Sequence, residues 1–236
     1  MRNAIILLTG ILFLNIFFSS CNRTKRGVGP VEVKSMQVTG FSKVTLEIPA
    51  DLTIVIADSF NCVITAQSNI IEVVKVNVSG NELTISSDYS FDDSKIEMVI
   101  SLPGVTALGI SGSGNIKTLN VIKSEKLKLN IDGSGEMDIH AETDELRSRI
   151  NGSGSCNLKG STKSLNVDIN GSGDLHGFQL SSIDAEVELN GSGDAEILAT
   201  DELNATVKGS GNIIYKGSPH LNSEITGSGN IKKSEE

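Results

Sequence analysis

From residue 108 onward, apolar and polar positions alternate, and a glycine motif interrupts the alternation at regular intervals. Gly-Ser-Gly occurs seven times, with copies 18 to 21 residues apart. One apolar residue stands two positions before each triplet and another stands two positions after it, as Ile150 and Cys156 do around residues 152–154. Because strand side chains alternate between faces, each copy predicts a strand, a glycine corner, a second strand and a loop. The corner glycines are Gly112, Gly114, Gly133, Gly135, Gly152, Gly154, Gly171, Gly173, Gly191, Gly193, Gly209, Gly211, Gly227 and Gly229.

Equivalent positions hold the same residue type in successive copies, which favours stacking of the copies in register. The sequence therefore predicts a parallel β-helix, or β-solenoid, with about seven rungs over residues 108–232. We expect both glycines of a triplet to point inward at a corner too sharp for a side chain, where glycine also permits positive φ. The alternative is an antiparallel meander, because Asn-Gly and Asp-Gly dipeptides in four of the copies are typical of hairpins.

Residues 31–107 also alternate in short runs, but without a repeat. Val44, Leu46 and Ile48 predict one strand, and a tight turn is expected at residues 79–81. Residues 88–95 are the most loop-like. The chain is thus predicted to be all-β, with residues 31–107 forming an irregular N-terminal part or cap of the solenoid and residues 233–236 a charged tail.

The first 20 residues have the pattern of an export signal. Arg2 precedes a mostly apolar run over residues 4–18, which is short for a membrane-spanning helix, and small residues lead to Cys21. This order resembles a bacterial lipoprotein signal, which implies that residues 1–20 are removed and that the Cys21 thiol carries a lipid. An ordinary secretory signal with an incidental cysteine is the alternative. Residues 21–30 then read as a polar, basic tether.

The composition argues against two classes of protein, disordered linkers and nucleic-acid-binding proteins. The 24 glycines accompany only 4 prolines and 38% hydrophobic residues, so a disordered linker is not expected. The net charge of −9 and the few aromatic residues argue against nucleic-acid binding. Two cysteines, Cys62 and Cys156, remain beyond the signal, and their apolar settings favour buried free thiols over a disulfide.

Acidic residues gather between residues 168 and 202. A candidate interaction face is formed by Asp174, Glu186, Glu188, Asp194 and Glu196. Stacked rungs would place Asp174 beside Asp194 and His176 beside Glu196, so a carbohydrate-active enzyme that uses paired carboxylates is one alternative. A solvated acidic face is favoured, since no catalytic triad is evident. The calcium-binding β-roll has nine-residue repeats that are lacking here, and neither a metal nor another cofactor is expected.

The lipoprotein-like start, the irregular β region and the Gly-Ser-Gly ladder together resemble the "putative auto-transporter adhesin, head GIN domain" family over about residues 36–231. The resemblance implies a β-helical fold without recognised catalytic residues. We expect a non-catalytic adhesion or envelope-interaction module in the outer membrane, on its periplasmic face or at the cell surface. The membrane through the lipid, a glycan or an envelope protein, and a second copy at the solenoid ends are its expected partners. A purely structural envelope protein is a further alternative.

Overall fold

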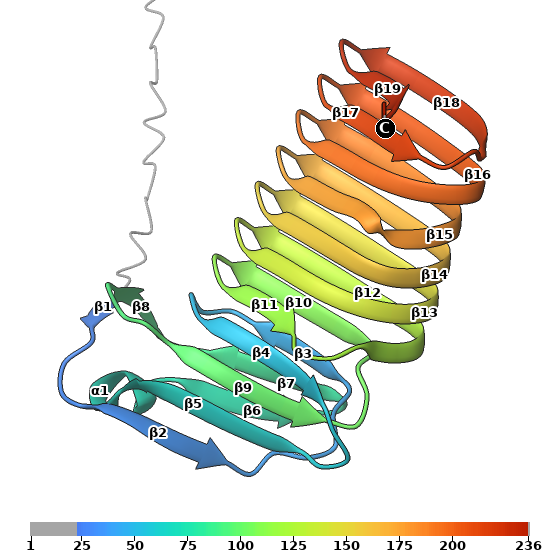
Figure 1. The fold of residues 1–236 in the computed structure, drawn as a ribbon. Coiled ribbons are helices and arrows are strands. Elements are labelled where there is room, and N and C mark those ends of the chain that lie inside the picture. The colour runs from blue at the N-terminus through green and yellow to red at the C-terminus, as the bar shows by residue number, and fades with distance from the viewer. Residues whose placement is uncertain (1–22, 236) are drawn as a thin grey trace, which may run out of the picture.

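Alternating side chains produce strands along nearly the whole chain in the computed structural model, which describes residues 23–235 (Figure 1). The one helix among these residues is a single turn, α1 (Ser68–Ile71). The strands are β1 (Arg23–Arg26), β2 (Val31–Met36), β3 (Lys43–Leu46), β4 (Asp51–Ile56), β5 (Asn61–Gln67), β6 (Lys75–Ser79), β7 (Glu82–Ser86), β8 (Tyr89–Asp92), β9 (Glu97–Leu102), β10 (Ala107–Gly112), β11 (Asn115–Thr118), β12 (Ile122–Gly133), β13 (Glu136–Gly152), β14 (Ser155–Gly171), β15 (Asp174–Gly191), β16 (Asp194–Gly209), β17 (Asn212–Lys216), β18 (His220–Gly227) and β19 (Asn230–Lys233).

The repeating half is a parallel β-solenoid. Each rung pairs in parallel with the rung below, so that Ile131, Ile150 and Ile169 stand one above another and the column continues through Leu189 and Val207. The predicted solenoid is confirmed, and the antiparallel meander is excluded because every pairing between β10 and β19 is parallel.

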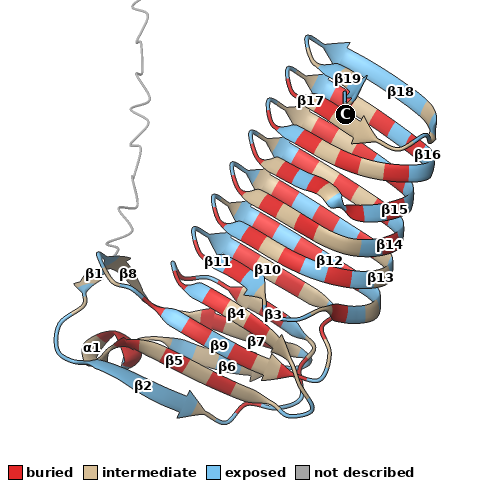
Figure 2. Ribbon diagram, in the orientation of Figure 1, coloured by how far each residue is buried: buried red, intermediate tan, exposed pale blue. Residues whose placement is uncertain are grey.

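The core is a continuous apolar column between two walls. One wall consists of the strand segments that precede the glycine corners, and the other consists of the segments that follow them. Buried and exposed residues alternate along both, which produces the stripes in Figure 2. Leu129 and Ile131 fill the column from the preceding wall, and Met137 and Ile139 fill it from the following wall. Each such burial stabilises the fold by roughly 1.5–3 kcal/mol.

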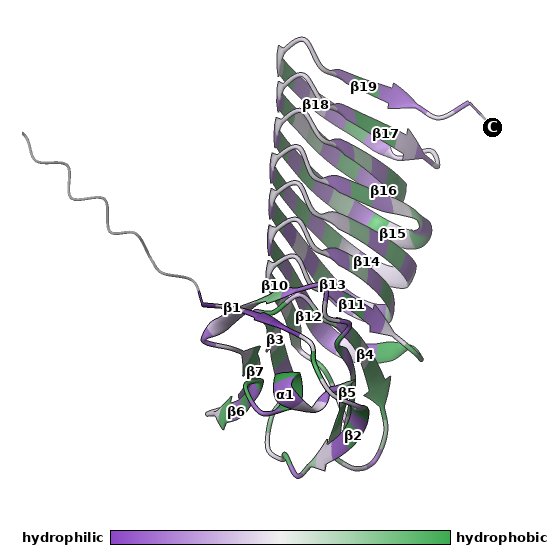
Figure 3. Cartoon of the chain, turned by 90° about the vertical axis from the view of Figure 1, so that its left-hand side faces the viewer, coloured by the Kyte–Doolittle hydropathy of each residue, from purple (hydrophilic) through white to green (hydrophobic). Residues whose placement is uncertain are grey.

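The N-terminal region extends the stack before capping it. Strands β3 and β4 pair in parallel with β10 and β11, and β7 and β9 pair in parallel with β3 and β4. The spatial order of these layers therefore differs from their order in the sequence. Beyond these layers the strand pairing changes from parallel to antiparallel: β5 pairs with β9, β2 with β5 and β6 with β7. The predicted turn at residues 79–81 connects β6 to β7. Figure 3 shows these strands gathered beneath the regular rungs.

Two segments that the sequence presents as irregular are in fact paired with each other. Within the expected tether, β1 pairs in parallel with β8, which lies within the loop-like residues 88–95. Beyond β1, the Gly27 N–H donates to Ser94 Oγ at 2.9 Å and the Val28 N–H donates to Asn69 Oδ1 at 2.8 Å. Part of the expected tether is therefore held against the folded region, and the sequence gives no sign of this because the partners of its backbone groups lie far away in sequence.

The predicted lipidation site, Cys21, lies outside the described residues. No helix within residues 23–235 is long and apolar enough to cross a membrane. Cys62 and Cys156 are both buried and free, as the sequence predicts. Burial raises the pKa of the Cys62 thiol to about 11 and that of Cys156 to about 12, so both thiols stay protonated and inert at neutral pH.

Candidate functional site

The seven Gly-Ser-Gly corners stack along one exposed edge of the solenoid, which we call the glycine edge. Its seven serines are all exposed: Ser113, Ser134, Ser153, Ser172, Ser192, Ser210 and Ser228. From the second corner upward, each serine N–H donates to the carbonyl of the first glycine in the corner below, at 2.8–2.9 Å. The backbone is thus tied from rung to rung, and the serine hydroxyls form a column that faces solvent.

The two glycines of a corner are required for different reasons, as Gly152 and Gly154 show. Gly152 has φ of +120°, and a Cβ there would overlap the carbonyl of Gly133 in the rung below. A Cβ on Gly154 would point into the core, 2.5 Å from Ile131 Cγ2. The expectation that both glycines point inward is therefore wrong for the first one. Because its φ is positive, the alternation of side-chain directions is interrupted there, and a Cβ would point toward the neighbouring rung instead of the core.

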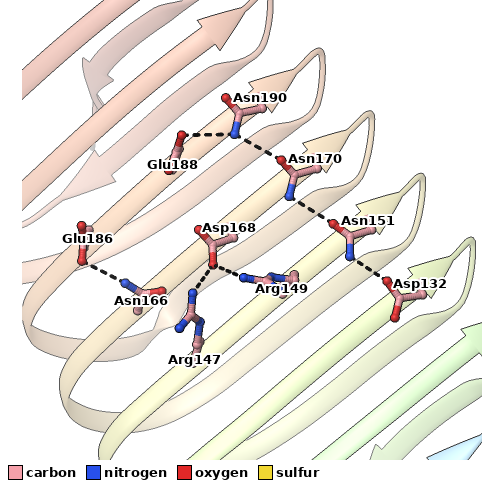
Figure 4. Close-up of polar contacts among 10 residues, drawn as sticks. All are labelled: Asp132, Arg147, Arg149, Asn151, Asn166, Asp168, Asn170, Glu186, Glu188 and Asn190. Atoms are coloured by element: carbon pink, nitrogen blue, oxygen red, sulfur yellow. Dashed lines mark hydrogen bonds and ion pairs between the residues drawn. The ribbon is translucent and has the colours of Figure 1, made fainter.

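A ladder of amide side chains runs along the preceding wall, directly beside the glycine edge (Figure 4). Asn151 Nδ2 donates to Asp132 Oδ1 at 2.6 Å, Asn170 Nδ2 donates to Asn151 Oδ1 at 3.1 Å, and Asn190 Nδ2 donates to Asn170 Oδ1 at 3.1 Å. Such a chain holds each side chain in one orientation, because every amide donates to the rung below and two of them also accept from the rung above. The ladder therefore presents ordered polar groups at a constant spacing.

A second polar column runs along the following wall, on the other side of the glycine edge. The Asp194 N–H donates to Asp174 Oδ1 at 2.8 Å, so these two carboxylates lie in adjacent rungs as the sequence predicts. Asn212 donates to Asp194 Oδ1 through both its backbone N–H and its Nδ2, each at 2.8 Å. The carboxylates of Asp174 and Asp194 thus accept hydrogen bonds from the next rung, which stabilises their stacking.

The predicted acidic face is divided between the two walls. Asp174, Asp194 and Glu196 lie on the following wall, whereas Glu186 and Glu188 lie on the preceding wall. Counting along the sequence hides this division, because the chain reverses direction at each corner. The predicted single face is therefore wrong, although all five residues lie on rungs β15 and β16.

Carboxylates of the preceding wall have cationic or amide partners. Lys208 Nζ lies 2.7 Å from Glu188 Oε1, and its hydrogen bond, together with one from Asn190, lowers the pKa of Glu188. On the preceding wall, Arg147 and Arg149 both reach Asp168 Oδ2, at 2.8 and 3.4 Å (Figure 4). Within residues 23–235, no three His, Cys, Asp or Glu side chains are grouped so that they could hold a metal ion.

The predicted stacking of His176 and Glu196 is present on the following wall. The two residues are register partners, and His176 Nδ1 lies 3.4 Å from Glu196 Oε2. The neighbouring Phe178 lies in an irregular part of β15 that sequence reasoning did not identify as a site. The sequence feature that could have revealed this irregularity is the change in corner spacing, from 20 residues between Gly171 and Gly191 to 18 between Gly191 and Gly209.

A family model described as "Putative auto-transporter adhesin, head GIN domain" matches residues 40–219 of this chain. No curated protein matches the sequence.

Three crystal structures of bacterial proteins have a similar fold. A "putative adhesin" from Bacteroides fragilis is 24% identical, with a TM-score of 0.84 over 89% of this chain and 100% of that chain. A "putative lipid binding protein" from Parabacteroides distasonis is 24% identical, with a TM-score of 0.77 over 90% of this chain and 100% of its own. A "putative adhesin" from the same species is 26% identical, with a TM-score of 0.72 over 89% and 100%.

Proposed function

The chain belongs to the "putative auto-transporter adhesin, head GIN domain" family, and from this we propose that it is a lipid-anchored, extracytoplasmic adhesion module that acts without catalysis. The observation that carries the proposal is the glycine edge. It presents the same exposed serine in seven successive rungs, between ordered columns of amides and carboxylates. A rigid array of identical weak polar groups is suited to multivalent binding, in which avidity replaces a deep pocket.

The solenoid backbone supports this role because it fixes the spacing of the contacts. Each corner is joined to the next by backbone hydrogen bonds, so that the serines cannot move independently. Such preorganisation lowers the entropy lost when a partner with a matching repeat binds. We propose that the partner is a repetitive polymer of the cell surface or the envelope.

We further propose that Cys21 carries the membrane anchor, on the outer membrane. The Cys21→Ala variant is expected to lose metabolic labelling with palmitate and to move from the membrane fraction to the soluble fraction, because the acylated thiol is removed. Intact mass and fractionation of cells that produce the whole chain measure both effects. The matched control is Cys62→Ala, whose thiol is buried and which should remain labelled and membrane-bound. Equal labelling of the Cys21→Ala variant would contradict the anchor.

The adhesive role predicts that substitution of the glycine edge weakens attachment. Phosphatidylcholine vesicles that carry the whole chain are expected to adhere to mucin or to isolated cell envelopes, with binding that rises more steeply than the protein density. A triple variant, Ser153→Glu, Ser172→Glu and Ser192→Glu, should reduce this binding at least tenfold, since three weak contacts are replaced by repelling charges. Vesicle retention on coated surfaces measures the effect.

The control places the same three charges on the opposite edge, as Ser161→Glu, Ser164→Glu and Ser181→Glu, where the serines are also exposed. This variant should adhere like the parent chain, and thermal unfolding should show that both variants are folded. If neither mucin nor cell envelopes retain vesicles that carry the parent chain, or if the two triple variants bind equally, the glycine edge is not the adhesive surface.

A further inference from the structure

The structure contains one marked irregularity in the following wall, midway along β15 (Figure 1). Along β14, a single residue, Leu158, faces two residues of β15, Gly177 and Phe178. Along β16, the pairing moves directly from Gly177 to Ser181, so that residues 178–180 have no partner in that strand. A β-bulge of this kind bends its strand and re-aims a side chain, and bulges are enriched beside binding and active sites.

The bulge includes an aromatic residue on the outer surface of a mostly polar wall. Phe178 and Tyr215 are the two aromatic residues between positions 108 and 235. Tyr215 packs against the apolar core, whereas Phe178 is half-buried in the wall and lies under Lys216, whose Nζ is 4.6 Å from the ring centroid. Phe178 and Gln179 both lie outside the buried column, which resumes at Leu180, so the bulge leaves two successive side chains on the outer surface of the wall.

Hydrogen-bonding side chains from neighbouring rungs surround this ring and line a depression of about 440 Å³. Lys159 Nζ lies 3.1 Å from Asp138 Oδ1, and His176 Nδ1 lies 3.4 Å from Glu196 Oε2. The amides of Asn157 and Gln179 complete the polar lining. With Lys216 included, two carboxylates are balanced by two ammonium groups, so the depression has no net charge when the histidine is neutral.

We propose that this depression, which we call the Phe178 subsite, binds a neutral hexopyranose unit of a glycan. A pyranose ring combines an apolar C–H face with a rim of hydroxyl groups that both donate and accept hydrogen bonds. Phe178 offers the matching apolar surface, the carboxylates accept, Lys159 donates, and the amides do both. The balanced charge favours a neutral sugar over an acidic one. The inference rests on the proposed adhesive function, for which it names the ligand class.

Lys216 has a defined part in this arrangement. Its ammonium lies over the face of Phe178 that a sugar would use, and a partly exposed cation–π contact is weak enough to be exchanged. When a pyranose stacks on the ring, the flexible lysine side chain moves to the rim and donates a hydrogen bond to a hydroxyl group.

The test uses the whole chain in detergent and five soluble probes: the methyl glycosides of glucose, galactose, mannose, N-acetylglucosamine and glucuronic acid. Saturation-transfer NMR should detect binding of at least one neutral glycoside, and titration gives its affinity. Phe178→Leu keeps an apolar side chain but removes the ring, and should weaken binding roughly tenfold, while Phe178→Trp restores it. Binding of none of the probes, binding of the glucuronide alone, or unchanged affinity in Phe178→Leu would each overturn the proposal.

The same samples separate this subsite from the adhesive edge. Thermal unfolding of Phe178→Leu should match that of the parent chain, so that a loss of sugar binding is not a loss of fold. The triple serine variant of the glycine edge should bind the free glycoside normally, because its substitutions lie outside the depression. Adhesion without glycoside binding would refute the Phe178 subsite alone, whereas glycoside binding without adhesion would refute the proposed function alone.

Discussion

Gly154→Val is expected to destabilise the solenoid by about 3 kcal/mol, since the new side chain enters a fully occupied corner. Its Cβ would lie 2.5 Å from Ile131 Cγ2 and 2.7 Å from the carbonyl oxygen of Gly135. Neither atom can move freely. Ile131 is buried in the core, and the Gly135 carbonyl accepts a hydrogen bond from the Ser155 N–H at 3.0 Å. Relief of the overlap therefore disrupts packing, the backbone ladder, or both.

The loss of stability should differ between rungs, because each rung of a solenoid contacts only its neighbours. Chemical denaturation followed by circular dichroism measures the total loss in free energy of unfolding, and hydrogen exchange shows which rungs are destabilised. We expect amides from residue 155 onward to lose protection before those of the N-terminal layers. Ser153→Ala is the matched control, since Ser153 is exposed between the two glycines, and it should change stability by less than about 0.5 kcal/mol. A cost for Gly154→Val as small as that of the control would contradict the assigned corner geometry.

The repeat explains why the sequence predicts the regular half of the fold so directly. Ile131, Ile150 and Ile169 occupy equivalent positions in successive copies, and only parallel stacking in register buries all of them together. Layers without a repeat carry no such signal. Nothing local indicates that β7 and β9 lie beneath β3 and β4, or that β1 pairs with β8, because those pairings depend on contacts between segments far apart in sequence.

The sequence predicts which residues of the candidate site stack, but not the geometry of the glycine corner or of the bulge. The stacking of Asp174 on Asp194 and of His176 on Glu196 follows from the repeat. The orientation of the first corner glycine does not, since counting alternate faces assumes extended backbone and fails at a positive φ. The bulge at Phe178 was detectable only as a change in spacing, which reveals that residues are inserted but not where the strand accommodates them.

Ile150→Ala is expected to cost about 2–5 kcal/mol, as large-to-small substitutions in a packed core do. Ile150 is 0% exposed and is stacked between Ile131 and Ile169. The cavity would collapse poorly, because backbone hydrogen bonds to the rungs on both sides fix the spacing of the walls. Ile150→Val removes one methylene group and should cost about 0.5–1.5 kcal/mol.

The same substitution in the last rung provides the matched control. Ile225 continues the column above Val207, but it is 45% exposed, so Ile225→Ala should cost about 1 kcal/mol or less. Guanidinium denaturation of the two variants measures the difference at identical chemistry. Equal losses at positions 150 and 225 would mean that the column does not stabilise the fold through burial. A gradient from the middle of the stack to its last rung would instead show that each isoleucine contributes according to the neighbours above and below it.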